Sequence, residues 1–249
     1  MNKFLPERFV ERIDRLMLGI EPLDALRAGR IVHPIDVTLD GRPVKIPRHD
    51  SCRHALLFKP GIKTPIVIRM SDRRRRFVPR RISYPVPADI ETPSPRVRRP
   101  ALYPGAAYDV GNSFTGMRGR VTWSASAADE TPVRWVRVEA RIGGRLVGRA
   151  HGDDRGEFLL LLDSSATGFG ALPEKLELAA QVTVFGRAPV QVSMQDPLAD
   201  LPVEILPGDP DDVSPGEKIP PEYGLLSSRV VIFKLGVPLT GQEKFFFQP

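Results

Sequence analysis

Apolar and polar residues alternate with a period of two along most of the chain, a pattern typical of half-buried β-strands. Within residues 135–142, Val136, Val138, Ala140 and Ile142 fall on one face and the charged residues fall on the other. Similar runs, separated by turn residues, lie at 35–41, 54–61, 65–72, 77–87, 118–126, 145–163, 175–186 and 227–236. The 26 prolines and 21 glycines disfavour long helices, because proline removes a backbone donor and clashes in a helix interior. The pattern therefore predicts a mainly β protein.

One stretch near the N-terminus has a helical period instead. Phe9, Ile13 and Leu16 recur at spacings of three and four residues, with charged residues between them. A glycine and a proline end this pattern, and a second short helix is predicted at 23–28. We therefore expect a short amphipathic helical arm within residues 1–30, which either packs on its own domain or docks on a neighbouring subunit.

Composition divides the rest of the chain into four segments. We expect a small β unit at 31–88, a stiff Pro/Arg-rich linker at 89–107 and a larger β domain at 108–196. Residues 197–249 would then form an acidic, proline-rich strap that ends in a returning strand and a tail.

Two prolines change the interpretation of the run 77–87. Proline cannot donate to the hydrogen bonds of a sheet, so it is confined to edge strands, strand starts and bulges. Because Pro79 and Pro85 lie in this run, it is predicted to be an edge strand or an extended strap.

The run VRVEARIGGRLVGRAHGDDRGEFLLLL, residues 136–162, resembles the carboxypeptidase regulatory-like, or transthyretin-like, domain family. In that family an alternating strand is followed by a turn of the pattern G-x-(A/V)-x-(T/G)-D-x-x-G-x-F-x-L. The matching positions are Gly148, Ala150, Asp153 or Asp154, Gly156, Phe158 and Leu160. The resemblance implies an antiparallel Ig/transthyretin-like β-sandwich that carries no catalytic residues.

Such a domain should contain one apolar core and a tight turn. The residues predicted to share the core are Val136, Val138, Phe158, Leu160 and Val184. Asp153 and Asp154 can accept hydrogen bonds from nearby amides, and Gly156 can adopt a positive φ, so a turn is predicted between two strands. The alternative interpretation of this turn is a calcium site, but its sequence lacks the regular alternation of oxygen ligands that calcium-binding loops have.

Charge is distributed unevenly along the chain. The formal net charge is +6, and the segment from Arg69 to Arg99 contains ten arginines against three acidic residues. A second segment, 196–222, contains eight acidic residues and one lysine. Of the 36 cationic residues, 28 are arginines, which form planar bidentate pairs with carboxylates. Non-specific DNA binding would be served about as well by lysine.

We therefore favour an ionic seam, within one chain or between chains, over a solvated face and over nucleic-acid binding. The arginines predicted to take part are Arg73, Arg74, Arg75, Arg76, Arg80 and Arg81. Their predicted acidic partners are Asp209, Asp211 and Asp212.

Candidate catalytic or metal chemistry is confined to the run RHDSCRH, residues 48–54. Structural zinc sites usually take ligands from two well-separated pairs, and this run is the only cluster of such residue types. A Cys52–histidine nucleophile pair would lack a third orienting group and an oxyanion turn. A polar turn that leads into a strand is favoured. We predict no catalytic, cofactor-binding or metal-binding residue.

The single cysteine, Cys52, rules out an intrachain disulfide and argues against a disulfide-stapled secreted domain. No apolar signal region is present at the N-terminus, and no apolar run approaches the ~20 residues that span a bilayer. We expect cytoplasmic synthesis without a signal peptide. This expectation is compatible with later release of the chain as part of a particle.

These observations favour a non-enzymatic structural or assembly component whose partners are protein subunits, either further copies or other chains. Its expected contacts are the arginines above, the arm residues Phe9, Ile13 and Leu16, and the aromatic tail Phe245, Phe246 and Phe247. The chain also resembles carboxypeptidase regulatory-like proteins that accompany phage-tail-like contractile injection systems. The alternatives are a β module that binds carbohydrate or a cell envelope, and a nucleic-acid-binding protein.

Overall fold

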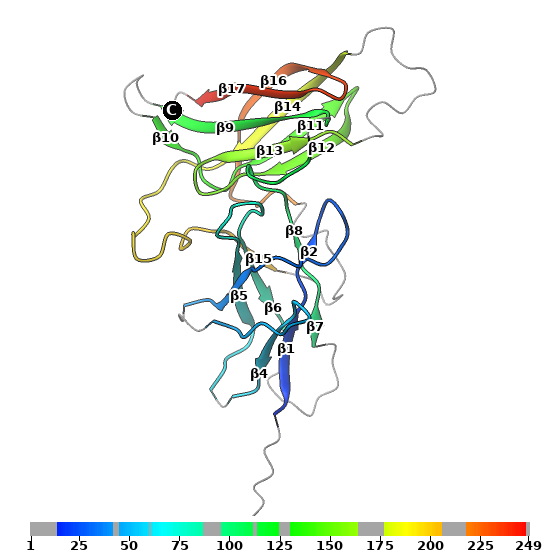
Figure 1. Cartoon of the computed structure of the whole chain (residues 1–249). Coiled ribbons are helices and arrows are strands. Elements are labelled where there is room, and N and C mark those ends of the chain that lie inside the picture. The colour runs from blue at the N-terminus through cyan, green and yellow to red at the C-terminus, as the bar shows by residue number, and fades with distance from the viewer. Residues whose placement is uncertain are drawn as a thin grey trace, which may run out of the picture.

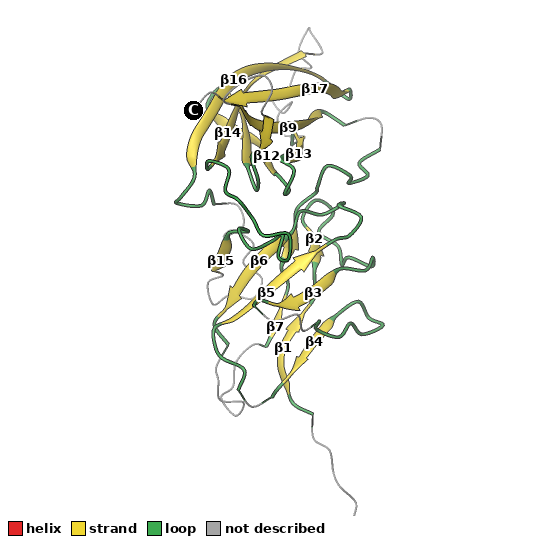
Figure 2. Ribbon diagram, turned by 90° about the vertical axis from the view of Figure 1, so that its left-hand side faces the viewer, coloured by secondary structure: helices red, strands yellow, loops and turns green. Residues whose placement is uncertain are grey.

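The computed structural model describes residues 14–41, 45–59, 61–86, 96–111, 114–124, 130–163, 177–205 and 218–247, with side chains as far as residue 239. This part of the chain is mainly β, as the alternation predicts, and it contains no helix. It therefore offers no helix that is long and apolar enough to cross a membrane. The strands form two units, one above the other in Figures 1 and 2.

Three small sheets make up the lower unit. In the first, β1 (Leu16–Ile20) lies between β4 (His54–Leu57) and β7 (Val97–Arg98). The second has the order β15–β6–β5–β3 and consists of β3 (Asp36–Leu39), β5 (Ile66–Ser71), β6 (Arg80–Tyr84) and β15 (Val203–Ile205). The third is the parallel pair of β2 (Leu23–Asp24) and β8 (Ala101–Leu102).

These sheets enclose one apolar core. In β5, alternate residues Ile66, Ile68 and Met70 point inward and are buried, while the intervening residues are partly exposed. Tyr84 of β6 joins this core, and so does Leu159 of the upper unit. The lower core therefore reaches the base of the upper unit.

The helix predicted within residues 1–30 is wrong where the structure describes this segment. Strand β1 replaces the end of the first predicted helix, and β2 lies within the second. Leu16 pairs with Leu57 of β4, and the other four residues of β1 are buried. A short continuous apolar run suits a strand buried on both faces as well as a helix, so spacing alone could not separate them. Phe9 and Ile13 lie outside the described residues.

Strand β6 is central, which corrects the predicted edge strand. It pairs antiparallel with β5 on one side and parallel with β15 on the other. Pro79 and Pro85 flank the strand and lie just outside its hydrogen-bonded residues, 80–84. The prolines therefore bound the strand without interrupting its ladder.

The predicted linker, 89–107, contains two strands in its described part, β7 and β8. The N–H groups of Gly19 and Glu21 donate to the carbonyls of Arg96 and Arg98 at 2.8 and 2.9 Å. This stretch is therefore a part of the lower unit, and the chain crosses to the upper unit only after β8.

In the upper unit, two four-stranded sheets face each other (Figure 1). In one, β9 (Gly116–Ser124) pairs with β10 (Glu130–Pro132), with β13 (Glu157–Leu161) and, in parallel, with β17 (Pro238–Phe247). The other is antiparallel with the order β12–β11–β14–β16 and consists of β11 (Arg137–Ile142), β12 (Arg145–His151), β14 (Glu177–Gly186) and β16 (Gly224–Lys234).

A second apolar core lies between these two sheets, and it confirms the predicted shared core. It contains all five expected residues, Val136, Val138, Phe158, Leu160 and Val184, each at most 1% exposed. The Phe158 ring lies against Gly119 of the neighbouring strand, where an added Cβ would lie 2.5 Å from the ring. Only glycine leaves the ring its space at this position.

Both units receive strands from the C-terminal segment 197–249. The returning strand predicted at 227–236 is confirmed by β16, which is followed by β17. The residues of the aromatic tail pair in parallel with β9: Phe245 with Val121, Phe246 with Thr122 and Phe247 with Trp123. The tail is therefore a sheet strand, and its role as an interface stays a prediction.

Candidate functional site: an arginine junction between the two units

The arginine-rich turn between β5 and β6 is organised by Asp72. Its carboxylate accepts the N–H groups of Arg74 at 2.9 Å and Arg76 at 3.2 Å, and the Nε–H of Arg76 at 3.0 Å. Arg75 between them adopts a φ of 57°, which is uncommon for a residue with a side chain. The turn places the guanidinium of Arg75 against the upper unit.

Arg75 contacts the turn that joins β12 to β13. Its Nη1 lies 3.1 Å from Asp153 Oδ2 and 2.8 Å from Asp154 Oδ1. Asp153 also accepts the N–H groups of Arg155 at 2.8 Å and Glu157 at 3.0 Å, which confirms the predicted turn. Burial raises the pKa of Asp153 above its usual value, and the hydrogen bonds from the two amides only partly offset this rise. Two turns from different units thus meet through one arginine.

A buried ion pair, Arg80 with Glu204, lies between β6 and β15. Arg80 Nε donates to Glu204 Oε1 at 3.0 Å, and Nη2 contacts the second carboxylate oxygen. The remaining Nη donates to the carbonyl of Ala101, and the guanidinium lies 5.2 Å from the centre of the Tyr103 ring. Burial alone would lower the pKa of Arg80, but Glu204 raises it above its ordinary value. The guanidinium of Arg80 therefore stays charged although it is buried.

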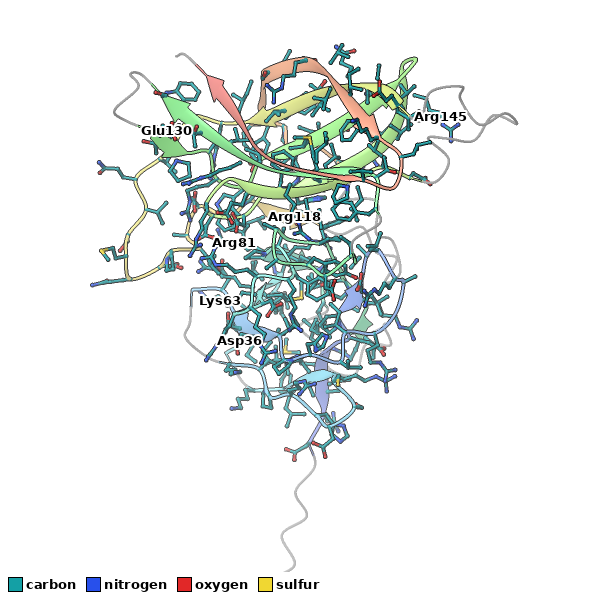
Figure 3. All side chains as sticks on the ribbon, turned by 45° about the horizontal axis from the view of Figure 1, so that its top comes forward. Asp36, Lys63, Arg81, Arg118, Glu130 and Arg145 are labelled. Atoms are coloured by element: carbon teal, nitrogen blue, oxygen red, sulfur yellow. The ribbon has the colours of Figure 1, made fainter. Side chains whose placement is uncertain are left out.

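Two arginines from neighbouring strands converge on Asp40. Arg81, which is labelled in Figure 3, donates from Nε to Asp40 Oδ2 at 3.0 Å, and Arg69 Nε lies 2.5 Å from Oδ1. Arg69 Nη1 also donates to Asp196 at 2.5 Å, and this bond lowers the pKa of Asp196. Arg81 further donates to two backbone carbonyls in the segment 196–204. The segment is therefore bound to the lower unit.

The upper unit binds the same segment through Arg134. Its Nε and Nη2 donate to the two oxygens of Asp200 at 2.8 and 2.9 Å, which is a bidentate arrangement. Arg134 also donates to the carbonyl of Asp154 at 3.3 Å, and Arg187 donates to the carbonyl of Asp200. The segment 196–204 therefore lies between arginines of both units. We refer to this segment, with the arginines and aspartates that bind it and with the Arg75 contact, as the junction.

Five of the six arginines of the predicted ionic seam contact carboxylates of the same chain. The pairs are Arg73 with Asp36, Arg75 with Asp153 and Asp154, Arg76 with Asp72, Arg80 with Glu204, and Arg81 with Asp40. Arg74 donates its backbone N–H to Asp72. The predicted partners Asp209, Asp211 and Asp212 lie outside the described residues. A contact of the arginines with a second chain stays a prediction.

Charged residues on the outer face of β11 are more buried than the alternation suggests. Arg137 and Glu139 are less than 10% exposed, although both fall on the face expected to meet water. An Nη of Arg137 and the hydroxyl of Tyr223 both donate to the carbonyl of Trp135, at 3.1 and 2.9 Å. Burial lowers the pKa of Arg137. Residues that follow β14 cover this end of the face, a long-range contact that no local pattern indicates.

An apolar cleft adjoins the junction. Two hollows of about 560 and 350 Å³ share the lining residues Leu26, Leu161, Leu162 and Asp163. The larger hollow is also lined by Tyr103 and His151, whose rings stack with their centres 3.7 Å apart. Volumes of this order, apolar linings and positions between domains are typical of small-molecule sites.

The run 48–54 forms the predicted polar turn. The N–H of Cys52 donates to the carbonyl of His49 at 2.9 Å, the N–H of His49 donates to the carbonyl of Arg53 at 2.7 Å, and β4 begins at His54. Among the residues that the structure describes, no three His, Cys, Asp or Glu side chains are grouped to hold a metal ion.

Comparisons with known proteins give no family for the chain. No protein-family model and no curated protein sequence matches it. Among solved structures, a 9R-lipoxygenase from Cyanothece PCC8801 aligns with 15% identity and a TM-score of 0.25. The alignment covers 54% of this chain and 16% of the lipoxygenase chain. A similarity this low relates neither the folds nor the functions.

Proposed function

We propose that this chain is a non-enzymatic structural component that assembles with other protein subunits. The observation that carries the proposal is strand β16, the edge of its sheet and 11 residues long. Three of its apolar side chains, Leu225, Val230 and Ile232, are 64%, 67% and 49% exposed. Monomeric proteins usually blunt such edges with prolines, bulges or charges, because an open edge is a template for another strand. Residues 230–233 of this edge carry no charge, proline or bulge, and an open stretch of this kind is typical of a protein–protein contact.

The use of the arginines within the chain supports the same proposal against nucleic-acid binding. Phosphate contacts require guanidinium groups that are available to the backbone of the nucleic acid. Arg75, Arg76, Arg80 and Arg81 are engaged with carboxylates of this chain. Of the paired arginines in the turn, Arg73 is the exposed one, and it contacts Asp36.

We further propose that the upper unit is an Ig/transthyretin-like β-sandwich and that the assembly is a phage-tail-like contractile injection particle. Two facing sheets around one core, and the turn at Asp153, support the domain type. The particle is suggested only by the resemblance of the chain as a whole to carboxypeptidase regulatory-like proteins that accompany such systems, and no single motif carries this resemblance. Electron microscopy of particles assembled with and without this chain tests the setting, and an unchanged particle would exclude it.

The assembly proposal is tested by placing charge on the open edge of β16. We expect Val230→Lys combined with Ile232→Lys to abolish co-elution of the chain with its co-expressed subunits in size-exclusion chromatography. Met194→Lys is the matched control, because Met194 is 99% exposed and lies outside every strand. Co-elution that survives the double substitution would overturn the proposal.

The cleft supports a second candidate function, a β module that binds an apolar ligand. Its volume and lining are suitable, and Arg149, whose Nε lies 3.6 Å from Glu139 Oε1, lies beside the apolar wall. A fluorescent anionic probe such as anilinonaphthalene sulfonate should bind the native protein, and Leu162→Lys should remove that binding while the melting temperature is retained. Equal binding to the variant would exclude this site.

A further inference from the structure

The backbone of β16 presents a regular open edge. From Ser228 to Lys234 each residue lies opposite one residue of β14, without a bulge. The carbonyl of Lys234 accepts the N–H of Val237 at 3.1 Å, so the polar groups of Lys234 point away from β14. The N–H and C=O of one residue point to the same side of a strand, and that side alternates along it. Val230 and Ile232 therefore present their backbone donors and acceptors to the open edge.

The two faces of this strand differ strongly. Val231 and Phe233 point into the core of the upper unit and are 6% and 0% exposed. Val230 and Ile232 lie on the outer face and are 67% and 49% exposed. Figures 1 and 2 show β16 at the outer rim of the upper unit. A strand added here would therefore cover apolar side chains as well as backbone groups.

We propose that β16 pairs antiparallel with β16 of a second copy of this chain, about a two-fold axis at Val231. The inference rests on the proposed function and names the partner of its open edge. In this register Val230 of each copy lies opposite Ile232 of the other and exchanges backbone hydrogen bonds with it. The two four-stranded sheets join into one continuous sheet across the dimer.

Side-chain pairing selects this register and this partner. The two cations of the strand do not face each other: Arg229 lies opposite Phe233 of the second copy, and Lys234, whose open side is bridged to Val237, lies beyond the paired residues 229–233. Like charges directly opposite destabilise a strand pair, whereas pairs of β-branched apolar residues stabilise it. An axis at Val230 would instead place Ile232 opposite Ser228 and lose an apolar pair on each side. A two-fold contact also closes on itself, as most homo-oligomer interfaces do.

The oligomeric state tests the proposal. We expect sedimentation of the purified chain to give a mass of twice 27.6 kDa. Val230→Lys with Ile232→Lys should raise the dimer dissociation constant at least 100-fold, and Met194→Lys should leave it unchanged. Far-ultraviolet circular dichroism and melting check that the variants are folded. A monomer at all concentrations, or a dimer insensitive to the double substitution, would overturn the inference.

The register has its own test, a disulfide across the axis. Residues 231 of the two copies would form a non-hydrogen-bonded antiparallel pair, whose Cα atoms lie about 4.5 Å apart and within disulfide reach. In a Cys52→Ser background, Val231→Cys should give a disulfide-linked dimer on mild oxidation, and Ser228→Cys should not. A dimer that persists without this cross-link, or that cross-links through Ser228→Cys, would overturn the axis at Val231.

Failure of the inference can be told apart from failure of the proposed function. If the chain alone is monomeric but its edge variant no longer co-elutes with other subunits, the edge binds a different chain. In that case the self-pairing is wrong and the proposed function stands. If neither self-association nor co-elution depends on Val230 and Ile232, both are wrong.

Discussion

Arg75 and Asp154 join the two β units through paired contacts. Arg75 Nη1 lies 2.8 Å from Asp154 Oδ1, and Nη2 lies 3.4 Å from Oδ2. The residues are 79 positions apart in the sequence, and each lies in a tight turn of its own unit. Because both side chains are partly shielded from water, their attraction is screened less than that of an exposed pair.

We therefore expect Arg75→Glu to destabilise the protein by roughly 1–3 kcal/mol, since it places a third carboxylate beside Asp153 and Asp154 and removes their donor. Arg73→Glu is the matched control. Arg73 is 84% exposed, and exposed pairs contribute only about 0–1 kcal/mol. Chemical denaturation of both variants measures the difference. Equal losses of stability would show that the Arg75 contact does not link the units energetically.

The buried pair of Arg80 and Glu204 should be more sensitive to losing one partner than to losing both. Glu204→Leu leaves a buried guanidinium without its counterion, which costs about 3–5 kcal/mol. Arg80→Leu combined with Glu204→Leu removes both charges and should cost less than either single change. A double-mutant cycle, measured by chemical denaturation, gives the coupling free energy between Arg80 and Glu204. A double variant less stable than both single variants would contradict this prediction.

Phe158 should be among the most costly residues to truncate in the upper core. We expect Phe158→Ala to lower the free energy of unfolding by about 3–5 kcal/mol, because a large buried ring is replaced by a cavity. Gly119→Ala should also destabilise the protein, because its methyl group would overlap the ring. Combining the two should cost less than the sum of the single changes, since alanine at 158 leaves room for the new methyl group. Additive losses would mean that the two residues do not share this space.

Stability in acid should depend on Glu21. Burial alone would raise the pKa of this carboxylate, but hydrogen bonds and charges from Arg30, Arg53 and Arg99 lower it below 4.5. The folded protein then binds fewer protons here than the unfolded chain does. The stabilisation is present above pH 4.5 and is lost as the pH falls below it. Glu21→Gln should therefore flatten the loss of stability as the pH falls below 4.5. An unchanged acid profile would contradict the prediction.

Local alternation was sufficient to predict most of the longer strands and the upper core. In β5 and β11 the inward residues are apolar and regularly spaced, so burial follows from the pattern. The turn at Asp153 was predictable for a similar reason, because its side chain bonds amides only two and four residues away. These features depend on contacts that lie close together in the sequence.

The rest depends on contacts between distant segments. Three short strands, β7, β8 and β15, have only two or three residues each. They are defined by parallel backbone pairing with β1, β2 and β6. A strand this short shows no alternation of side chains that a sequence pattern could reveal. The carboxylates that bind the arginines were missed for the same reason. Asp40 follows β3, which β5 separates from β6, so only the sheet order brings it near Arg81. Asp72 is the exception, because it lies in the same turn as Arg76, four residues away.

The order of the strands along the chain differs from their grouping into the two units. Strand β15 follows β14 of the upper unit in the sequence but completes a sheet of the lower one. Until residue 205 has left the ribosome, the lower unit lacks both a strand and the carboxylate that neutralises Arg80. The upper unit in turn waits for β16 and β17. Neither half is a continuous stretch of chain, so no single cut between residues 102 and 203 yields two complete halves. Both units therefore become complete only after residues 203–247 have been synthesised.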